Sequence, residues 1–370
     1  MNRGIQIQTV PSSLANTRAA LDQRLRDLGL HDQVLQSEDP HSGVLSVQFK
    51  PKDFEVLTPA HDTLGLPMRV PHAFAAPSAA LMWEIWVAWL CAPIPLKFDS
   101  WEDLESAQRL RHNLSRNASK TSLNFRTEEA SRPDAYWTYR EDSGYVLLPH
   151  ADLVESLIMA TQPEVSGATY AFSCYRATEY VLLLSIAQEA REHNHALYEK
   201  LQKQWREKAI SSRQFHASFL HEIGEVDAPL PMTWYVPGDR IWFKNPHPLS
   251  SDATGYEGSW VIYLGQGLFC NFWDHRNPYT LDHKCVELYH WRHGFWINKR
   301  GTPQIDEDVV TELTNQTLSD PIKASQVLSA MKRYRDPQGV YAGGGCIDST
   351  REMPRKVMPW NCEVVLPQAA

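Results

Sequence analysis

The stretch that most constrains the fold is Ala168–Ala190, with the sequence ATYAFSCYRATEYVLLLSIAQEA. Its pattern predicts a short strand, a turn that carries Cys174, and a long apolar helix with little polar surface. A thiol at a helix start lies where free backbone N–H groups and the positive end of the helix dipole meet, which favours the thiolate. Most free cysteines are small buried hydrophobic residues, so Cys174 becomes a candidate nucleophile only if partners follow downstream.

Composition narrows the class of protein and its compartment. A net charge of −8 and a pI near 6.0 argue against a general nucleic-acid binder, which would carry a basic surface. The N-terminus lacks the apolar core of a signal peptide, so we expect a cytoplasmic location at synthesis, and any export would proceed without such a signal. The six cysteines form no CxxC pair and fit a reducing compartment better than a disulfide scaffold.

Residues 1–130 are expected to form an accessory region that is mainly helical. Leu14–Leu30 is predicted as an amphipathic helix and Gly43–Leu57 as one or two strands. The Trp-rich run Ala79–Pro95 contains Glu84 and ends in prolines, so it is too short and too broken for a membrane span. It is predicted as a buried helix, the alternative being a segment that meets a membrane or a partner.

Residues 131–301 are predicted as the main domain, in which helices are followed by strands, and residues 302–370 as a helix and an irregular tail packed on it. A strand–turn–strand unit, a helix and the Cys174 unit come first, and charged helices follow. The later expectations are a strand at Arg240–Lys244, a hairpin over residues 258–273 that turns at Gln266–Gly267, a strand over residues 285–298, and a helix at Asp308–Leu328.

Segments of this domain resemble one particular family. AFSCYRAT around Cys174, and PGDRIWFKNP followed by EGSWVIYLG after Pro237, are similar in sequence and order to the bacterial protein-glutamine γ-glutamyltransferases. These are small calcium-independent transglutaminases known from spore coats. RPDAYWTYREDSGYVLLP, before the cysteine, is similar to the segment that precedes their catalytic helix, and the resemblance covers about Arg132 to Gly301.

The resemblance implies an α+β fold with a papain-like or NlpC/P60-like core, in which the helix that carries the nucleophilic cysteine packs on an antiparallel sheet. Cys174 would attack the carboxamide of a protein-bound glutamine, release ammonia and form a thioester. A lysine amine or water would then take the acyl group. The family needs no metal, and no cofactor is expected.

The chain departs from the family pattern at several positions. Ser173 stands where the family has a glutamate before its nucleophile, and Ser259 where it has a second glutamate, with Glu257 two residues earlier. Alignment without gaps places Phe272 at the family's histidine. A longer insertion instead brings in YHWRHGFW, where His293 resembles the family's histidine strand.

The acid and base assignments therefore keep their alternatives. His293 is the first choice for the histidine that pairs with Cys174, and His290, on the other face of the predicted strand, and His275 are the others. Glu257 is the candidate that orients the histidine. Asn271 and Asp274 could replace it, because amides also orient histidines in thiol enzymes.

The resulting expectation is an acyltransferase that cross-links or deamidates glutamine side chains of a protein substrate, with lysine or another amine as acceptor. Residues 1–130 would recognise substrate, a cognate inhibitor or an export partner, as in an effector delivered between cells. No nucleic acid and no stable membrane span are expected. The alternatives are a papain-like cysteine peptidase or amidase, and a degenerate transglutaminase fold that serves as a binding module.

Overall fold

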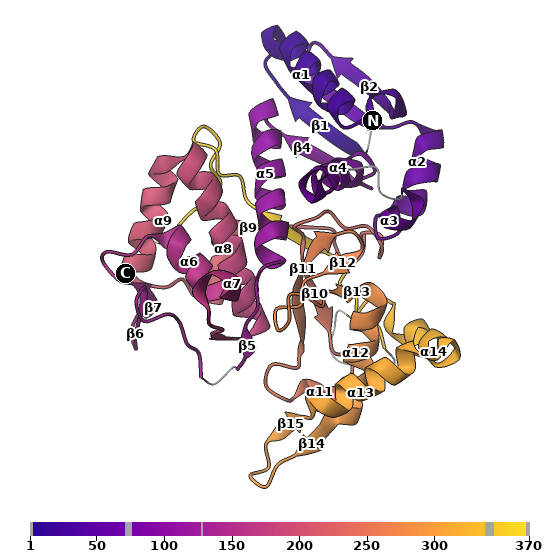
Figure 1. The fold of residues 1–370 in the computed structure, drawn as a ribbon. Coiled ribbons are helices and arrows are strands. Elements are labelled where there is room, and N and C mark those ends of the chain that lie inside the picture. The colour runs from indigo at the N-terminus through magenta and orange to yellow at the C-terminus, as the bar shows by residue number, and fades with distance from the viewer. Residues whose placement is uncertain (1–2, 71–75, 127–128, 337–343, 368–370) are drawn as a thin grey trace.

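The computed structural model describes residues 3–70, 76–126, 129–336 and 344–367. Figure 1 shows an N-terminal sheet with its helices beside a larger body, and the long helix α5 (Trp101–Ala118) runs between them. Helices are interspersed with strands that form largely antiparallel sheets, so the fold is α+β. No helix in the described ranges is long and apolar enough to cross a membrane.

The N-terminal region contains a four-stranded sheet in addition to the expected helices. The strand order is β2-β3-β1-β4, and only β1 and β4 run parallel. Ile5 and Ile7 alternate with polar neighbours and pair with Val47 and Leu45 in the core. These strands are short, and a five-residue alternation such as GIQIQ is too brief to separate from a linker. The strands are β1 (Gly4–Gln8), β2 (Val34–Asp39), β3 (Val44–Phe49) and β4 (Pro95–Phe98).

The helices of this region pack around that sheet. The predicted buried helix is confirmed as α4 (Pro77–Leu90), in which every residue from Trp83 to Leu90 is buried. A helix that is apolar around its whole circumference requires burial on all sides. The other helices are α1 (Leu14–Asp27), α2 (Pro51–Leu57) and α3 (Leu66–Arg69).

The larger body is built on a six-stranded antiparallel sheet. Its order is β13-β12-β11-β10-β16-β9, and helix α8 (Cys174–His193) packs against β11 and against α5. The predicted hairpin is confirmed, and Gln266 (φ +57°) and Gly267 (φ +71°) form its turn. The strands are β9 (Leu220–Ile223), β10 (Arg240–Lys244), β11 (Gly258–Gly265), β12 (Leu268–Phe269), β13 (Tyr279–Thr280) and β16 (Arg351–Pro354).

Smaller elements surround this sheet and the cysteine helix. The predicted strand–turn–strand unit before the cysteine is confirmed as the hairpin β6–β7, and the helices expected on either side of the Cys174 unit are present. The strands are β5 (Asn124–Phe125), β6 (Trp137–Arg140), β7 (Gly144–Leu147), β8 (Ala171–Phe172), β14 (Phe295–Ile297) and β15 (Pro303–Ile305). The helices are α6 (Leu153–Thr161), α7 (Pro163–Ser166), α9 (His195–Glu207), α10 (Ser212–Phe219) and α11 (Pro248–Ser251).

Two expectations for the C-terminal third are corrected. The strand predicted over residues 285–298 is mostly the helix α12 (Leu281–Gly294), and only β14 at its end is extended. Buried residues of this helix include Leu281, Cys285 and Leu288, which recur at helical rather than strand spacing. The single helix predicted beyond residue 307 is divided into α13 (Glu307–Leu318) and α14 (Pro321–Met331), because a proline at the first position of a helix begins a new one.

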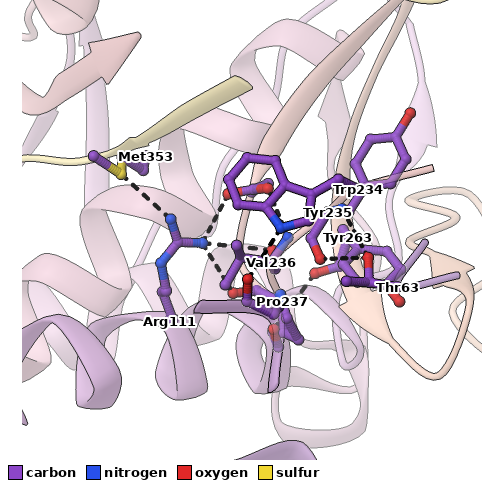
Figure 2. Close-up of polar contacts among 11 residues, drawn as sticks. Thr63, Arg111, Trp234, Tyr235, Val236, Pro237, Tyr263 and Met353 are labelled. Atoms are coloured by element: carbon purple, nitrogen blue, oxygen red, sulfur yellow. Dashed lines mark hydrogen bonds and ion pairs between the residues drawn. The ribbon is translucent and has the colours of Figure 1, made fainter. Parts of the chain in front are cut away.

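The N-terminal region and the larger body share a buried polar seam, shown in Figure 2. The Thr63 hydroxyl accepts the Tyr235 N–H at 2.8 Å and donates to the Tyr235 carbonyl at 2.8 Å. The Trp234 indole donates to the carbonyl of Ala88 in α4 at 3.0 Å, and Arg111 of α5 donates to Asp239 at 2.7 Å. The segment before β10 is therefore fixed by both α4 and α5.

Candidate active site

Cys174 is the first residue of α8, directly after β8. The Ser173 hydroxyl caps the helix by accepting the Arg176 N–H at 3.3 Å. The residues that follow, including Ala177 and Val181, are fully buried, so the helix holds the cysteine rigidly. The strand–turn–helix expectation for this stretch is confirmed.

Cys174 lies on the wall of a cavity of about 700 Å³. Strand β11, the loop after β12, and helices α12 and α13 supply the other walls. Much of the lining is aromatic or acidic. The lining residues include Phe125, Tyr256, Ser259, Asn271, Trp273, Asp274, Tyr279, His283, Lys284, Glu287, Trp291, Glu307 and Thr314.

Burial raises the pKa of the Cys174 thiol above its ordinary value. The backbone N–H of Trp260, the charge of Lys284 and the backbone N–H of Tyr175 act in the opposite direction without reversing it. The helix start favours the thiolate form of Cys174, and burial favours the protonated thiol. The thiol is therefore protonated at rest, and its use as a nucleophile requires a proton acceptor.

His293 and His290 lie on α12, and neither lines the cavity. Their Nδ1 atoms are 3.0 Å apart, and His290 Nε2 is 2.7 Å from the hydroxyl of Thr317 in α13. Burial, with a smaller contribution from His293, lowers the pKa of His290 to about 4. The predicted strand would have pointed one of the pair at Cys174, whereas the helix places His290 against Thr317 of α13 and His293 against His290.

The remaining candidate histidine, His275, contacts Glu164 at 3.2 Å and is also outside the lining. The histidine that the fold does bring to the cavity is His283, in the first turn of α12, where the Thr280 hydroxyl accepts its backbone N–H at 3.1 Å. Burial lowers the pKa of the His283 imidazole, which keeps the ring neutral at pH 7. The available signal was the helix start TLDH, with threonine as the N-cap residue.

Of the three residues that could orient a histidine, one lies outside the cavity lining and two belong to it. Glu257 is exposed, its carboxylate accepts only a weak contact from the Gly255 N–H at 3.4 Å, and it does not line the cavity. Asn271 and Asp274 do line it. The Asn271 amide is already engaged, because it accepts the Trp273 N–H at 3.0 Å and donates to the Asn277 carbonyl at 3.0 Å. A hydrogen bond from Asn277 lowers the pKa of Asp274, so this carboxylate is charged.

Helix α12 also places a lysine and a glutamate on the cavity wall that the sequence did not indicate. Lys284 is only 2% exposed and donates to Glu287 at 2.7 Å. Its Nζ lies 3.6 Å from the centre of the Tyr279 ring. Among the described residues, no group of three or more His, Cys, Asp or Glu side chains is arranged to hold a metal ion.

Comparison with known proteins identifies a family and similar solved structures. The family model TGL, described as protein-glutamine gamma-glutamyltransferase, matches residues 71–348. No curated protein matches the chain. Among solved structures, the chain is similar to a transglutaminase from Geobacillus stearothermophilus without its C-terminal extension, with 17% identity and a TM-score of 0.38. That similarity covers 57% of this chain and 97% of the other.

Proposed function

This chain belongs to the TGL family of protein-glutamine gamma-glutamyltransferases, and from that premise we propose that it transfers the γ-glutamyl group of a protein-bound glutamine to an amine through a thioester on Cys174. The observation that carries the proposal is that Cys174, at a helix start, and the neutral imidazole of His283 both line one cavity. A thiol nucleophile and a proton acceptor in one site are what acyl transfer requires.

In the proposed reaction, His283 accepts the proton of the Cys174 thiol as the sulfur attacks the glutamine carboxamide carbon. The negative charge on the carbonyl oxygen is stabilised by free backbone N–H groups at the start of α8. The C–N bond then breaks, and His283 returns the proton to the departing ammonia. An amine attacks the thioester, loses a proton to His283 and releases the Cys174 thiol with the new amide.

The shape of the cavity supports an amine as the second substrate. Tyr256, Trp273 and Trp291 supply aromatic wall that suits a methylene chain, and Asp274 and Glu307 supply negative charge that attracts an ammonium group. An amine must compete with water for the thioester, which requires that it be held in attack geometry. Where no amine enters, water would resolve the thioester and the product would be deamidated glutamine.

The decisive experiment is incorporation of a small primary amine into a glutamine-containing protein in the presence of a calcium chelator. Mass spectrometry should show the amine adduct with loss of ammonia, or deamidation. Replacement of Cys174 by Ser should abolish both products, whereas the matched variant Cys362→Ser, at an exposed cysteine outside the cavity, should retain them. Cleavage of peptide bonds with neither product would instead identify a peptidase.

Serine at positions 173 and 259, where the family has glutamates, favours a second candidate, a transglutaminase fold that binds glutamine-bearing proteins without turning them over. Such a module would bind the substrate protein equally well with Ser at position 174. Calorimetric titration of wild-type and Cys174→Ser protein against the same substrate, with no product formed by either, would support this candidate.

A further inference from the structure

Lys284 occupies an environment that lysines rarely occupy. The residue is 2% exposed, yet it belongs to the lining of the cavity that contains Cys174. Removing an ammonium group from water is strongly unfavourable unless other groups compensate the charge. A charged lysine at this place therefore needs an explanation from its surroundings.

Two neighbours hold the Lys284 ammonium group in place. Glu287, one helical turn further along α12, accepts a hydrogen bond from it at 2.7 Å, and the face of Tyr279 lies 3.6 Å away. The ion pair lies within one rigid helix, with the Glu287 side chain 16% exposed. The position of the charge is therefore fixed before any substrate arrives.

Lys284 differs in the sign of its charge from the other charged residues of the cavity lining. Asp274, Glu287 and Glu307 bring negative charge to the lining, and among its described members Lys284 is the positively charged residue. Arg240, which also acts on the thiol, lies outside this lining and pairs with Glu352 of the neighbouring strand β16. Ser259 of strand β11 also lines the cavity, and its side chain is uncharged.

We propose that Lys284, oriented by Glu287, is the electrostatic partner that stabilises the Cys174 thiolate. The geometry assigns this role to α12, where the Lys284–Glu287 pair and His283 stand on one wall of the cavity. The inference rests on the proposed function only in taking Cys174 as the nucleophile. Lys284 contributes its charge, and His283 remains the group that moves the proton.

The test is the rate at which iodoacetamide alkylates Cys174 in the full-length protein as a function of pH, followed by peptide mass spectrometry. An opposite charge near an ionising group favours its charged form and can shift its pKa by about one unit or more. Lys284→Met should therefore move the midpoint of the profile to higher pH by about one unit, with an about tenfold slower reaction near neutral pH.

Two variants separate charge from packing. Lys284→Arg keeps the charge and should keep most of the wild-type rate. Lys332→Met removes the lysine that pairs with Asp282 at 2.8 Å outside the cavity lining, and should leave the profile unchanged. If Lys284→Arg shifts the midpoint as far as Lys284→Met does, the effect is not one of charge and the proposal is wrong.

A folded Lys284→Met protein with the wild-type midpoint would also overturn the proposal. Should that variant fail to fold, the double variant Lys284→Met/Glu287→Gln removes both members of the buried pair and leaves no uncompensated charge. It should show the same upward shift. Because alkylation is measured without a glutamine substrate, this result is independent of whether the protein transfers acyl groups.

Discussion

At the scale of single residues, Cys174 is subject to two opposing effects. The start of α8 stabilises a thiolate, and burial in the cavity wall destabilises it more strongly, so the pKa of the thiol is raised. Below that raised pKa, the thiolate fraction increases about tenfold with each unit of pH. We therefore expect the alkylation rate of wild-type Cys174 to rise continuously from pH 6 through pH 8, whereas a plateau that begins below neutrality would indicate a preformed thiolate.

His283 can be tested against the histidines that the sequence favoured. Removing a general base lowers the rate by about 10²- to 10⁴-fold. His283→Ala should show this loss of amine incorporation, and His293→Ala should remain near wild type. Because burial lowers the pKa of His283, its neutral form persists below pH 6.5, and the acid limb of the wild-type activity profile should lie below that pH. Full activity in His283→Ala would remove His283 from the mechanism.

At the scale of secondary-structure elements, the hairpin β11–β12 depends on a buried carboxylate from the N-terminal region. Glu84 of α4 is fully buried and accepts Tyr263 Oη at 2.7 Å, the Gln266 N–H at 2.7 Å and the Gln266 side-chain amide at 3.1 Å. These contacts fix the turn at Gln266, whose positive φ is unfavourable for a residue other than glycine. The hairpin leads directly to Asn271 on the cavity wall.

Glu84→Ala removes the acceptor of those three hydrogen bonds and leaves the buried Tyr263 hydroxyl without this partner, whereas Gln266 is exposed and can bind water. An unsatisfied buried group costs about 1–3 kcal/mol, so the free energy of unfolding should fall by about 1–3 kcal/mol. Denaturant unfolding measures this difference directly. Glu55→Ala, at an exposed position of α2, is the matched control and should change stability by less than about 0.5 kcal/mol. Equal effects in the two variants would show that Glu84 does not hold the turn.

The elements that sequence patterns predicted correctly are those with local signals. The Cys174 unit, the buried helix α4 and the hairpin at Gln266–Gly267 are each indicated by a pattern within about ten to twenty residues. Helix α12 was misread because Val286, Tyr289 and Trp291 are residue types that favour strands. Packing against α13 and α14 overrides that preference.

The misreading of α12 also explains why the candidate site was predicted only in part. Cys174 could be identified from its own helix start. With residues 285–298 as a strand, one of His290 and His293 would face the cysteine, and His283 and Lys284 would lie in the connection before it. Their place on the cavity wall depends on the helical register of α12, which only the tertiary fold determines.

At the scale of the whole molecule, the N-terminal region and the larger body share a hydrophobic core. Leu230, Trp234 and Val236, from the segment before β10, belong to the same buried cluster as the N-terminal sheet and α4. The polar seam through Thr63, Ala88 and Arg111 joins the same surfaces. Because the β10–β11–β12 sheet that supports the site begins at this seam, we expect residues 1–98 to be part of the folding unit.

A chain that begins at residue 99 should therefore fail to fold cooperatively. The deletion exposes Trp234 and Val236, both fully buried in the intact chain, and removes the Ala88 carbonyl that accepts the Trp234 indole. Burying large apolar side chains of this kind contributes about 1.5–3 kcal/mol each, a substantial share of the 5–15 kcal/mol by which a domain is stable. Calorimetry should show one transition for the full chain and none for the truncated one. Addition of separately produced residues 1–98 should restore the transition if the two parts fold only together, whereas a truncated chain that melts cooperatively and still incorporates amine would show that the larger body is an independent domain.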